Sequence, residues 1–350
     1  MRKPRIGFVG VGSMGQCAHL RNYASLAECE VAAIAEVRPQ LAAAVAQRYG
    51  VPRVYASAEA MLEREQLDGL VAIQPFDHHG QVVLPLYAAG IPVLTEKPLA
   101  SSIALGERLL AALREGGSWH MVGYHKRSDP ATMVAKAATL RFVASGELGT
   151  MRYVRITMPE GDWVAGGFAD RITSDEPVPP AAPDEPAADM DAATYRLYVN
   201  FVNYYIHQVN LLRHLLGEPY HITYADPSGV LLAAQSASGV AGVIEMSPYR
   251  TTVDWQETAL VAFERGYIQL DLPAPLASNR PGRVTIFRDP GAGAMPETTV
   301  PQLPWTHAMR QQALNFIRAI RGEAPPPCAA DEALEDLRVA REYIRLWKGV

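Results

Sequence analysis

Residues 5–15 read R-I-G-F-V-G-V-G-S-M-G, an apolar run that breaks into a turn rich in glycine. The run predicts a β-strand over 6–9, and the segment after the turn predicts a helix over 14–26. In such a unit the first glycine permits a sharp turn, the second lets a pyrophosphate approach the backbone, and the third lets the helix pack on the strand. Phosphate oxygens then bind at the positive N-terminal end of the helix. The residues predicted to form this phosphate-binding turn are Gly10, Gly12, Ser13, Met14 and Gly15.

An acidic residue follows the second predicted strand. That strand, Glu30–Ala35, leads into Glu36, which lies 21 residues after Gly15. A carboxylate at this place can accept hydrogen bonds from both hydroxyls of the adenosine ribose and repels a 2′-phosphate, so NAD is the expected cofactor. Arg38 keeps NADP as the less favoured alternative, because a guanidinium there could neutralise the phosphate. A glycine turn without any ligand is the competing interpretation, and the order strand, turn, helix, strand, acid disfavours it.

The composition excludes several classes of protein. The chain has 350 residues, of which 49% are hydrophobic, and a formal charge of −5 without basic runs. Two globular domains are therefore expected, and nucleic acid is not an expected partner. Cys17, Cys29 and Cys328 lie far apart, which predicts neither a disulfide framework nor a metal site and fits a reducing compartment. Neither a signal peptide nor an apolar stretch of roughly 18 residues is present, so we expect a cytoplasmic protein without a membrane partner.

Strands and helices alternate through the first third of the chain, which predicts a doubly wound parallel sheet with helices on both faces. Ligands bind beyond the carboxyl ends of the strands in such a sheet. Two of these ends carry polar groups, Q-P-F-D-H-H at 74–79 and E-K-P at 96–98. Further strands are expected at 54–55, 69–73, 92–95 and 120–124, and helices at 39–49, 79–89 and 103–114.

The pattern changes after residue 150. A strand over 151–158 precedes a segment, 174–191, that contains five prolines, six acidic residues and no basic one. Such a segment cannot fold by itself, so it is either a mobile excursion or a cover. A long helix over 194–216 follows, and then short strands that suggest a large, mostly antiparallel open sheet. The later elements are strands at 221–225, 230–235, 242–246, 258–264, 267–272 and 283–287, and helices at 305–321 and 332–346.

Polar side chains recur at spacings of three and four along the long helix, which places them on one face. The residues around them are mostly apolar, so the helix is expected to be buried and its polar stripe to meet polar groups. Neighbouring backbone or solvent could satisfy the stripe. An imidazole there could instead take a hydroxyl proton as a hydride leaves, because histidine titrates near pH 6.5. The stripe consists of Asn200, Asn203, His207, Asn210 and His214.

Nearly the whole chain resembles the Gfo/Idh/MocA oxidoreductases, a family that includes glucose–fructose oxidoreductase and inositol dehydrogenase. The resemblance rests on G-V-G-S-M-G at 10–15, the acid at Glu36, E-K-P at 96–98, V-G-Y-H-K-R-S-D-P at 122–130 and H-Q-V-N-L-L-R-H-L-L-G-E-P at 207–219, together with the segment 75–79. It implies an NAD-binding Rossmann domain over 1–124 and a substrate and oligomerisation domain of α+β type over 125–350. Whether the C-terminal helices pack back on the first domain stays open. It also implies a homodimer or homotetramer formed through the second sheet.

The resemblance assigns roles to individual residues. The family's catalytic lysine falls on Lys97, whose ammonium would polarise the reacting oxygen. The family's general base falls on His207. Asn203 stands where an aspartate usually lies one helical turn earlier, and Asn210 replaces a further acid, so the usual proton relay is altered. Phe76 replaces an asparagine near the nicotinamide.

Other positions complete the expected site. Four residues follow the sixth strand, where they could reach nicotinamide or substrate or belong to an interdomain hinge with surface charge: Tyr124, His125, Lys126 and Arg127. Trp163 could offer its indole to a sugar face or be plain core. No metal is expected, because the neighbouring histidines at 78–79 point apart and no carboxylate cluster surrounds them. The expected cofactor-binding residues at strand ends are Gln74, Pro75, His79, Glu96 and Lys97, and the expected substrate-binding residues are Lys97, Tyr124, His125, Trp163, Asn203 and His207.

Three functions remain open at this point. The leading one is an NAD-dependent dehydrogenase that acts on a hydroxyl of a sugar, glycoside or cyclitol. The second is a glycoside-cleaving enzyme that oxidises its substrate transiently and returns the hydride, with no net redox change. The third is a sugar- and NAD-binding sensor without catalysis, which the presence of both Lys97 and His207 disfavours.

Overall fold

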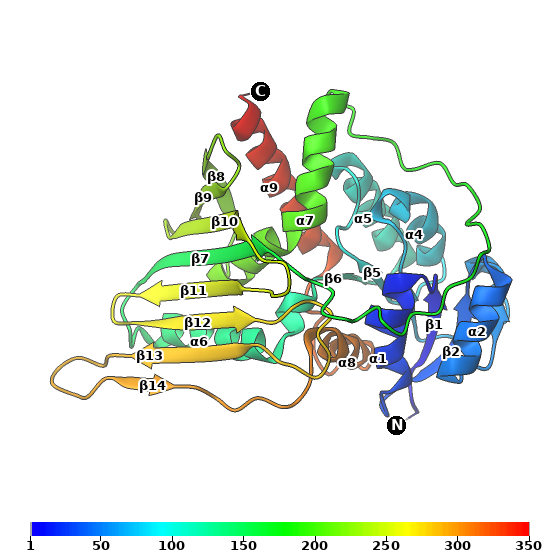
Figure 1. The fold of residues 1–350 in the computed structure, drawn as a ribbon, viewed down its shortest axis with the longest axis horizontal. Helices are drawn as coiled ribbons and strands as arrows, with labels where there is room; N and C mark the ends of the chain where they lie inside the picture. Colours follow the sequence, from blue (N-terminus) through cyan, green and yellow to red (C-terminus); the bar gives the residue numbers. More distant parts are fainter. Residues whose placement is uncertain (1, 350) are drawn as a thin grey trace. The chain divides into compact units, whose positions relative to one another are not determined.

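The computed structural model describes residues 2–349, and these divide into two compact units (Figure 1). The first unit contains the chain up to Tyr124 together with Gly167–Val199 and Met309–Leu337. The second contains His125–Gly166, Asn200–Ala308 and the chain from Arg338 onward. Two long helices, α7 (Ala192–Leu216) and α9 (Ala330–Lys348), each contribute residues to both units.

The first unit is built on a six-stranded sheet in the order β3-β2-β1-β4-β5-β6. Every neighbouring pair of strands is parallel. This is the strand order of a doubly wound nucleotide-binding sheet, so the predicted fold class is confirmed. The strands are β1 (Arg5–Val9), β2 (Glu30–Ala35), β3 (Val54–Tyr55), β4 (Gly69–Ala72), β5 (Val93–Glu96) and β6 (His120–Gly123).

Helices follow the strands of this sheet at nearly all of the predicted places. The helix after the glycine turn begins as a π-helix, η1 (Gly15–Leu20), with all six residues buried, and continues as the short α1 (Arg21–Ala24). A further helix, α3 (Ala58–Leu62), was not predicted; the Ser57 hydroxyl caps it by accepting from the amide of Ala60. The others are α2 (Pro39–Tyr49), η2 (Phe76–His78), α4 (His79–Tyr87) and α5 (Ile103–Gly116).

Helix α8 (Ala308–Ile320) completes the core of the first unit. Its residues Ala313, Phe316 and Ile317 are buried in one apolar cluster with Phe8 and Tyr23. The rings of Phe8 and Tyr23 meet edge to face at 5.3 Å, and those of Tyr23 and Phe316 at 6.4 Å. A C-terminal helix therefore supplies core residues to the sheet that carries the glycine turn.

The second unit contains an eight-stranded sheet in the order β14-β13-β12-β11-β7-β10-β9-β8, which confirms the predicted large and mostly antiparallel sheet. Only β7 and β10 pair in parallel. Along β7, Val154, Ile156 and Met158 are buried while the residues between them are half-exposed, so one face is covered. The strands are β7 (Met151–Glu160), β8 (Tyr220–Ala225), β9 (Leu231–Ser236), β10 (Ala241–Arg250), β11 (Glu257–Phe263), β12 (Gly266–Leu272), β13 (Arg283–Arg288) and β14 (Glu297–Thr299).

Three elements of the second unit were not predicted from the sequence: the 3-10 helix η3 (His125–Ser128), a helix and an edge strand. Helix α6 (Pro130–Ser145) packs against β12 and β13 (Figure 1). Asp129 caps its N-terminus by accepting from the amide of Ala131. The edge strand β14 has three exposed residues and so carries no alternating apolar pattern. Among residues 2–349, no helix has the length and apolar character that crossing a bilayer requires.

Candidate functional site

The glycine turn of the first unit leaves room for a ligand at one glycine and packs tightly at the other two. Gly10 has a φ of +83°, and a Cβ there would lie 2.7 Å from the carbonyl oxygen of Ile73. A Cβ on Gly15 would lie 2.5 Å from the carbonyl oxygen of Gly10, which is why the helix approaches the strand so closely. A Cβ on Gly12 would meet only Nη2 of Arg38, at an ordinary contact distance of 3.8 Å. The backbone at Gly12 is therefore less tightly packed than at Gly10 and Gly15, as the expected approach of a pyrophosphate requires.

Glu36, directly after β2, is buried and held by several donors. Its Oε2 accepts from the amide of Val11 at 3.0 Å and from Nη2 of Arg38 at 3.1 Å. Its Oε1 accepts from Nε of Arg38 at 2.8 Å. Burial by itself would raise the pKa of Glu36, but the hydrogen bonds from Arg38 and Val11 outweigh it and lower the pKa. The end of β2 therefore carries a negative charge at neutral pH.

An irregular segment, 170–184, which we call the acidic strap, lies along the glycine turn and two further helix starts. It contains the first part of the predicted acidic, proline-rich segment. The amide of Ile172 donates to Oε1 of Gln16 at 2.8 Å, and Nε2 of Gln16 donates back to the carbonyl of Ile172 at 2.9 Å. Nη1 of Arg171 donates to Oγ of Ser13 at 3.1 Å. The strap is thus anchored at residues of the predicted phosphate-binding turn.

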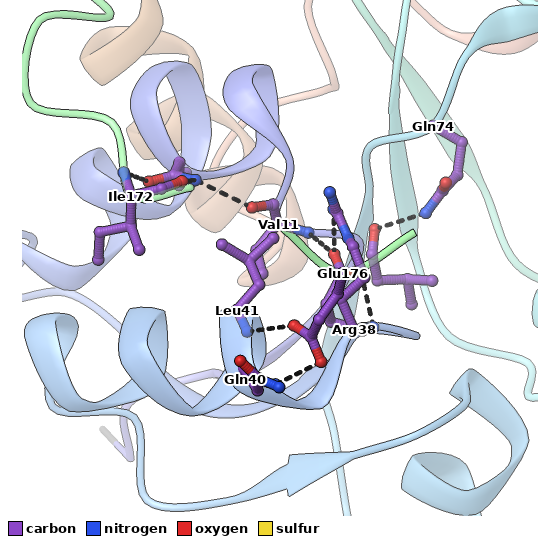
Figure 2. A network of polar contacts seen from close by, with 10 residues as sticks. Val11, Arg38, Gln40, Leu41, Gln74, Ile172 and Glu176 are labelled. Carbon is purple, nitrogen blue, oxygen red and sulfur yellow. Dashed lines mark hydrogen bonds and ion pairs between the residues drawn. The ribbon is translucent and has the colours of Figure 1, made fainter. Parts of the chain in front are cut away.

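Polar residues at the ends of β4 and β5 are used largely for internal support. Nε2 of Gln74 donates to the carbonyl of Val9 at 3.2 Å (Figure 2). Pro75 precedes η2, the turn that leads to His79. Nδ1 of the buried His79 lies 3.1 Å from the carbonyl oxygen of Leu99, and burial lowers the pKa of this imidazole despite that contact. His79 is therefore neutral at pH 7.

Glu96 and His19 form a buried pair beside Lys97. Nε2 of His19 lies 2.7 Å from Oε1 of Glu96, and Oε2 of Glu96 accepts from the amide of Lys97 at 3.2 Å. Burial opposes ionisation of Glu96, but the contact with His19 and the charge of Lys97 lower its pKa. Lys97 is the first residue after β5 and is half-buried. The pair fixes the backbone that presents Lys97, and no local sequence pattern indicates the contact between His19 and Glu96.

In the second unit, His207 on α7 lies against His125. Their ring centroids are 4.5 Å apart with an interplanar angle of 72°. Asn203, one turn earlier, is exposed, whereas Asn210 is buried and its Oδ1 accepts from Nε of Arg127 at 2.7 Å. Arg127, one of the residues after the sixth strand expected near nicotinamide or substrate, is thus hydrogen-bonded to α7 instead. In the predicted polar stripe, Asn200 and Asn203 are therefore exposed, His207 meets a second imidazole edge to face, and Asn210 binds a buried guanidinium.

A buried ion pair supports the same part of α7. Nζ of Lys126 bonds to Oε2 of Glu257, and Nε2 of Gln208 donates to Oε1 of the same carboxylate at 2.7 Å.

Two further residues of the expected site differ in exposure. Trp163, in the loop after β7, is 39% exposed, so it is not plain core. Tyr124, the last residue of the first segment of the first unit, is buried. Within residues 2–349, no group of three or more histidine, cysteine, aspartate and glutamate side chains could hold a metal ion.

Asp129, from the motif at 122–130, gives the fold a pH dependence. Burial raises its pKa to about 6 from 3.8, although the amides of Ala131 and Gly282 donate to it and lower the pKa. A raised pKa means that the folded state binds the proton more tightly, so this stabilisation is complete below about pH 4 and is lost as the pH rises through 6. The rise in the pKa of Asp129 from 3.8 to about 6 corresponds to about 3 kcal/mol in the free energy of unfolding.

An Asp129→Asn variant, neutral throughout, is expected to remove that dependence. We expect the difference in unfolding free energy between the variant and the wild type to shift by about 2–3 kcal/mol between pH 4 and pH 7, in favour of the variant at the higher pH. Urea denaturation at several pH values measures the difference. A difference that stays constant over this range would contradict the assignment.

Comparison with known proteins identifies the first unit's sheet. Residues 4–124 match the sequence model of an oxidoreductase family, Gfo/Idh/MocA, described as having an NAD-binding Rossmann fold. The chain is 23% identical to the inositol 2-dehydrogenase of Rhizobium meliloti (strain 1021) over 97% of this chain and 96% of that protein. It is 24% identical to the scyllo-inositol 2-dehydrogenase (NAD(+)) of Bacillus subtilis (strain 168) over 69% of this chain and 67% of that protein. A solved levoglucosan dehydrogenase, in complex with NADH and levoglucosan, shares the fold, with a TM-score of 0.73, 17% identity and coverage of 99% and 98%.

Proposed function

We propose that the chain, whose residues 4–124 match the Gfo/Idh/MocA oxidoreductase model, is a member of that family and transfers a hydride between NAD and a secondary hydroxyl of a sugar, glycoside or cyclitol. The observation that carries the proposal is the charged carboxylate of Glu36 beside the open glycine turn. The similarity to inositol dehydrogenases supports the substrate class. We assign cofactor binding to residues 1–124, and substrate binding and oligomerisation to the remainder.

The residues of the glycine turn fit a dinucleotide. The backbone at Gly12 is less tightly packed than at Gly10 and Gly15, and the turn precedes the N-terminus of η1, where backbone amides favour phosphate oxygens. Glu36 can accept hydrogen bonds from ribose hydroxyls while the amide of Val11 and Arg38 keep it ionised. When bound, NAD supplies the carbon that accepts the hydride. The protein's task is to hold the nucleotide, orient the substrate and manage the proton.

Lys97 and His207 are proposed to manage the reacting oxygen. The ammonium of Lys97 would stabilise negative charge that develops on the oxygen, and the imidazole of His207 would take the hydroxyl proton as the C–H bond is broken. Two observations support these roles: the buried Glu96–His19 pair fixes the backbone before Lys97, and the ring of His125 packs against that of His207. Asn203 can position the substrate, but an amide cannot relay the proton.

A Glu36→Gln variant tests the cofactor assignment. Loss of one charged hydrogen bond to the ribose is expected to raise the Kd for NADH by about 10-fold or more. The difference between the Kd values for NADH and NADPH should become smaller. Fluorescence titration measures both constants, with Glu30→Gln, an exposed glutamate at the other end of β2, as the matched control. An unchanged preference in Glu36→Gln would remove this residue from ribose recognition.

A substrate screen tests the reaction itself. NADH fluorescence is followed across sugars, glycosides and inositols, with ketone product and released aglycone measured in parallel. Accumulation of NADH together with ketone supports the proposal. Aglycone release without NADH would favour the transient-oxidation alternative, and binding without turnover across the panel would favour a sensor. We also propose that the protein is cytoplasmic and forms a homodimer or homotetramer through the second sheet. Light scattering tests the oligomeric state.

A further inference from the structure

The acidic strap crosses the edge of the first unit where a dinucleotide would bind. In a parallel sheet the helix N-termini gather at the carboxyl ends of the strands. The strap contacts three such places in succession: Gln16 at the start of η1, the first turn of α2, and the first turn of α4. At α4, Oδ2 of Asp184 accepts from the amide of Gly80 at 2.8 Å. Side chains of the strap are therefore placed beside the cofactor residues.

Glu176 of the strap binds the start of α2, the helix that follows Glu36 (Figure 2). Its Oε1 accepts from the amide of Gln40 at 3.0 Å, and its Oε2 accepts from the amide of Leu41 at 2.9 Å. Partial burial would raise the pKa of Glu176, but these two bonds outweigh it and lower the pKa, with the charge of Arg38 contributing. The α2 N-terminus therefore faces a carboxylate that is ionised at neutral pH.

The amides at the start of α2 can be accounted for one by one. The amide of Arg38 donates to Glu36, Pro39 has no N–H, and the amide of Ala42 donates to the carbonyl of Arg38. Glu176 takes the amides of Gln40 and Leu41. The donors that a helix start would otherwise offer to a phosphate are thus already used.

Two nitrogens of the Arg38 guanidinium are also already used as hydrogen-bond donors. Its Nε and Nη2 donate to Glu36 at 2.8 and 3.1 Å, and the hydrogen bond with Glu36 raises the pKa of Arg38, with the charge of Glu176 adding to it. A 2′-phosphate on a ribose held by Glu36 would lie close to the start of α2. It would meet two carboxylates there, together with donors that both carboxylates already occupy.

We propose that Glu176 is a specificity-determining residue that acts with Glu36 to exclude the 2′-phosphate of NADP. The proposal rests on the proposed cofactor site and deepens it. Glu36 selects the ribose hydroxyls, and Glu176 occupies the donors that a phosphate would need. A glutamate 140 residues beyond Glu36 in the chain thus completes a preference that the glycine-turn motif alone does not set.

Titration of NADH and NADPH into the full-length protein tests the proposal. A Glu176→Gln variant removes the charge and keeps the shape, and Glu176→Lys reverses the charge. We expect the Kd for NADPH to fall by about 10-fold in Glu176→Gln and further in Glu176→Lys, while the Kd for NADH stays within about threefold. Asp175→Asn, at an exposed neighbouring carboxylate, serves as the matched control and should change neither constant.

The outcomes separate this inference from the proposed function. A wild type that binds neither nucleotide removes the cofactor site and this inference with it. A wild type that binds NADH, with an NADPH-to-NADH ratio of Kd values unchanged in both Glu176 variants, overturns only the role of Glu176. Loss of the two bonds to the start of α2 is expected to lower the unfolding temperature of the variants slightly, and a cooperative thermal transition in each variant shows that the comparison is made on folded protein.

Discussion

A Lys97→Met variant is expected to lose at least about 100-fold in kcat while its Kd for NADH stays within about threefold of the wild type. Methionine keeps the length of the side chain and removes the ammonium that would stabilise charge on the reacting oxygen. The neighbouring Glu96–His19 pair remains, so the strand end keeps its conformation. Steady-state kinetics with the best substrate from the screen and fluorescence titration with NADH measure the two quantities.

The control for this variant is Lys3→Met, at an exposed lysine near the N-terminus, which should leave kcat and Kd unchanged. A Lys97→Met enzyme with full kcat would remove Lys97 from the mechanism. Equal losses in kcat and in NADH affinity would instead assign Lys97 to cofactor binding rather than to the reacting oxygen.

A His207→Asn variant should lose about 10²- to 10⁴-fold in kcat/KM, because an amide cannot accept the hydroxyl proton. The pH dependence of kcat/KM distinguishes a proton acceptor from a residue that only supports the structure. The wild type should lose activity on the acidic side as His207 becomes protonated, and this limb should disappear in the variant.

His221→Asn, at an exposed histidine on β8, is the matched control and should retain both the rate and the pH profile. Retention of the acidic limb in His207→Asn would mean that another group accepts the proton. His125, whose ring packs on His207, would then be the next candidate.

The sequence predicted the elements whose signals are local. The glycine turn, the strand that leads into Glu36 and the alternation up to residue 124 depend on contiguous residues, and the structure places a parallel sheet there. Helix α6 escaped prediction because its buried face consists largely of small and hydroxyl residues such as Ala131 and Thr132, while large apolar side chains such as Leu140 are exposed, so no apolar stripe is visible in the sequence.

The contacts that refine the site are long-range, and no local pattern encodes them. Glu176 binds amides at Gln40 and Leu41, and Arg127 binds Asn210, across separations of more than 80 residues. The composition of the acidic, proline-rich segment indicated that it would not fold alone, which left open where it would lie. Its place along the first unit depends on individual carboxylates that meet particular helix starts, and only the structure supplies these pairings.

The central claim is that Lys97 and His207 act on the same substrate oxygen in one step. A double-mutant cycle with Lys97→Met, His207→Asn and the double variant measures this most directly. The account predicts that the double variant is slower than the slower single variant by no more than about 10-fold, because each substitution already disables the shared step. Losses in kcat/KM that multiply, so that the double variant shows the product of the two single effects, would contradict it.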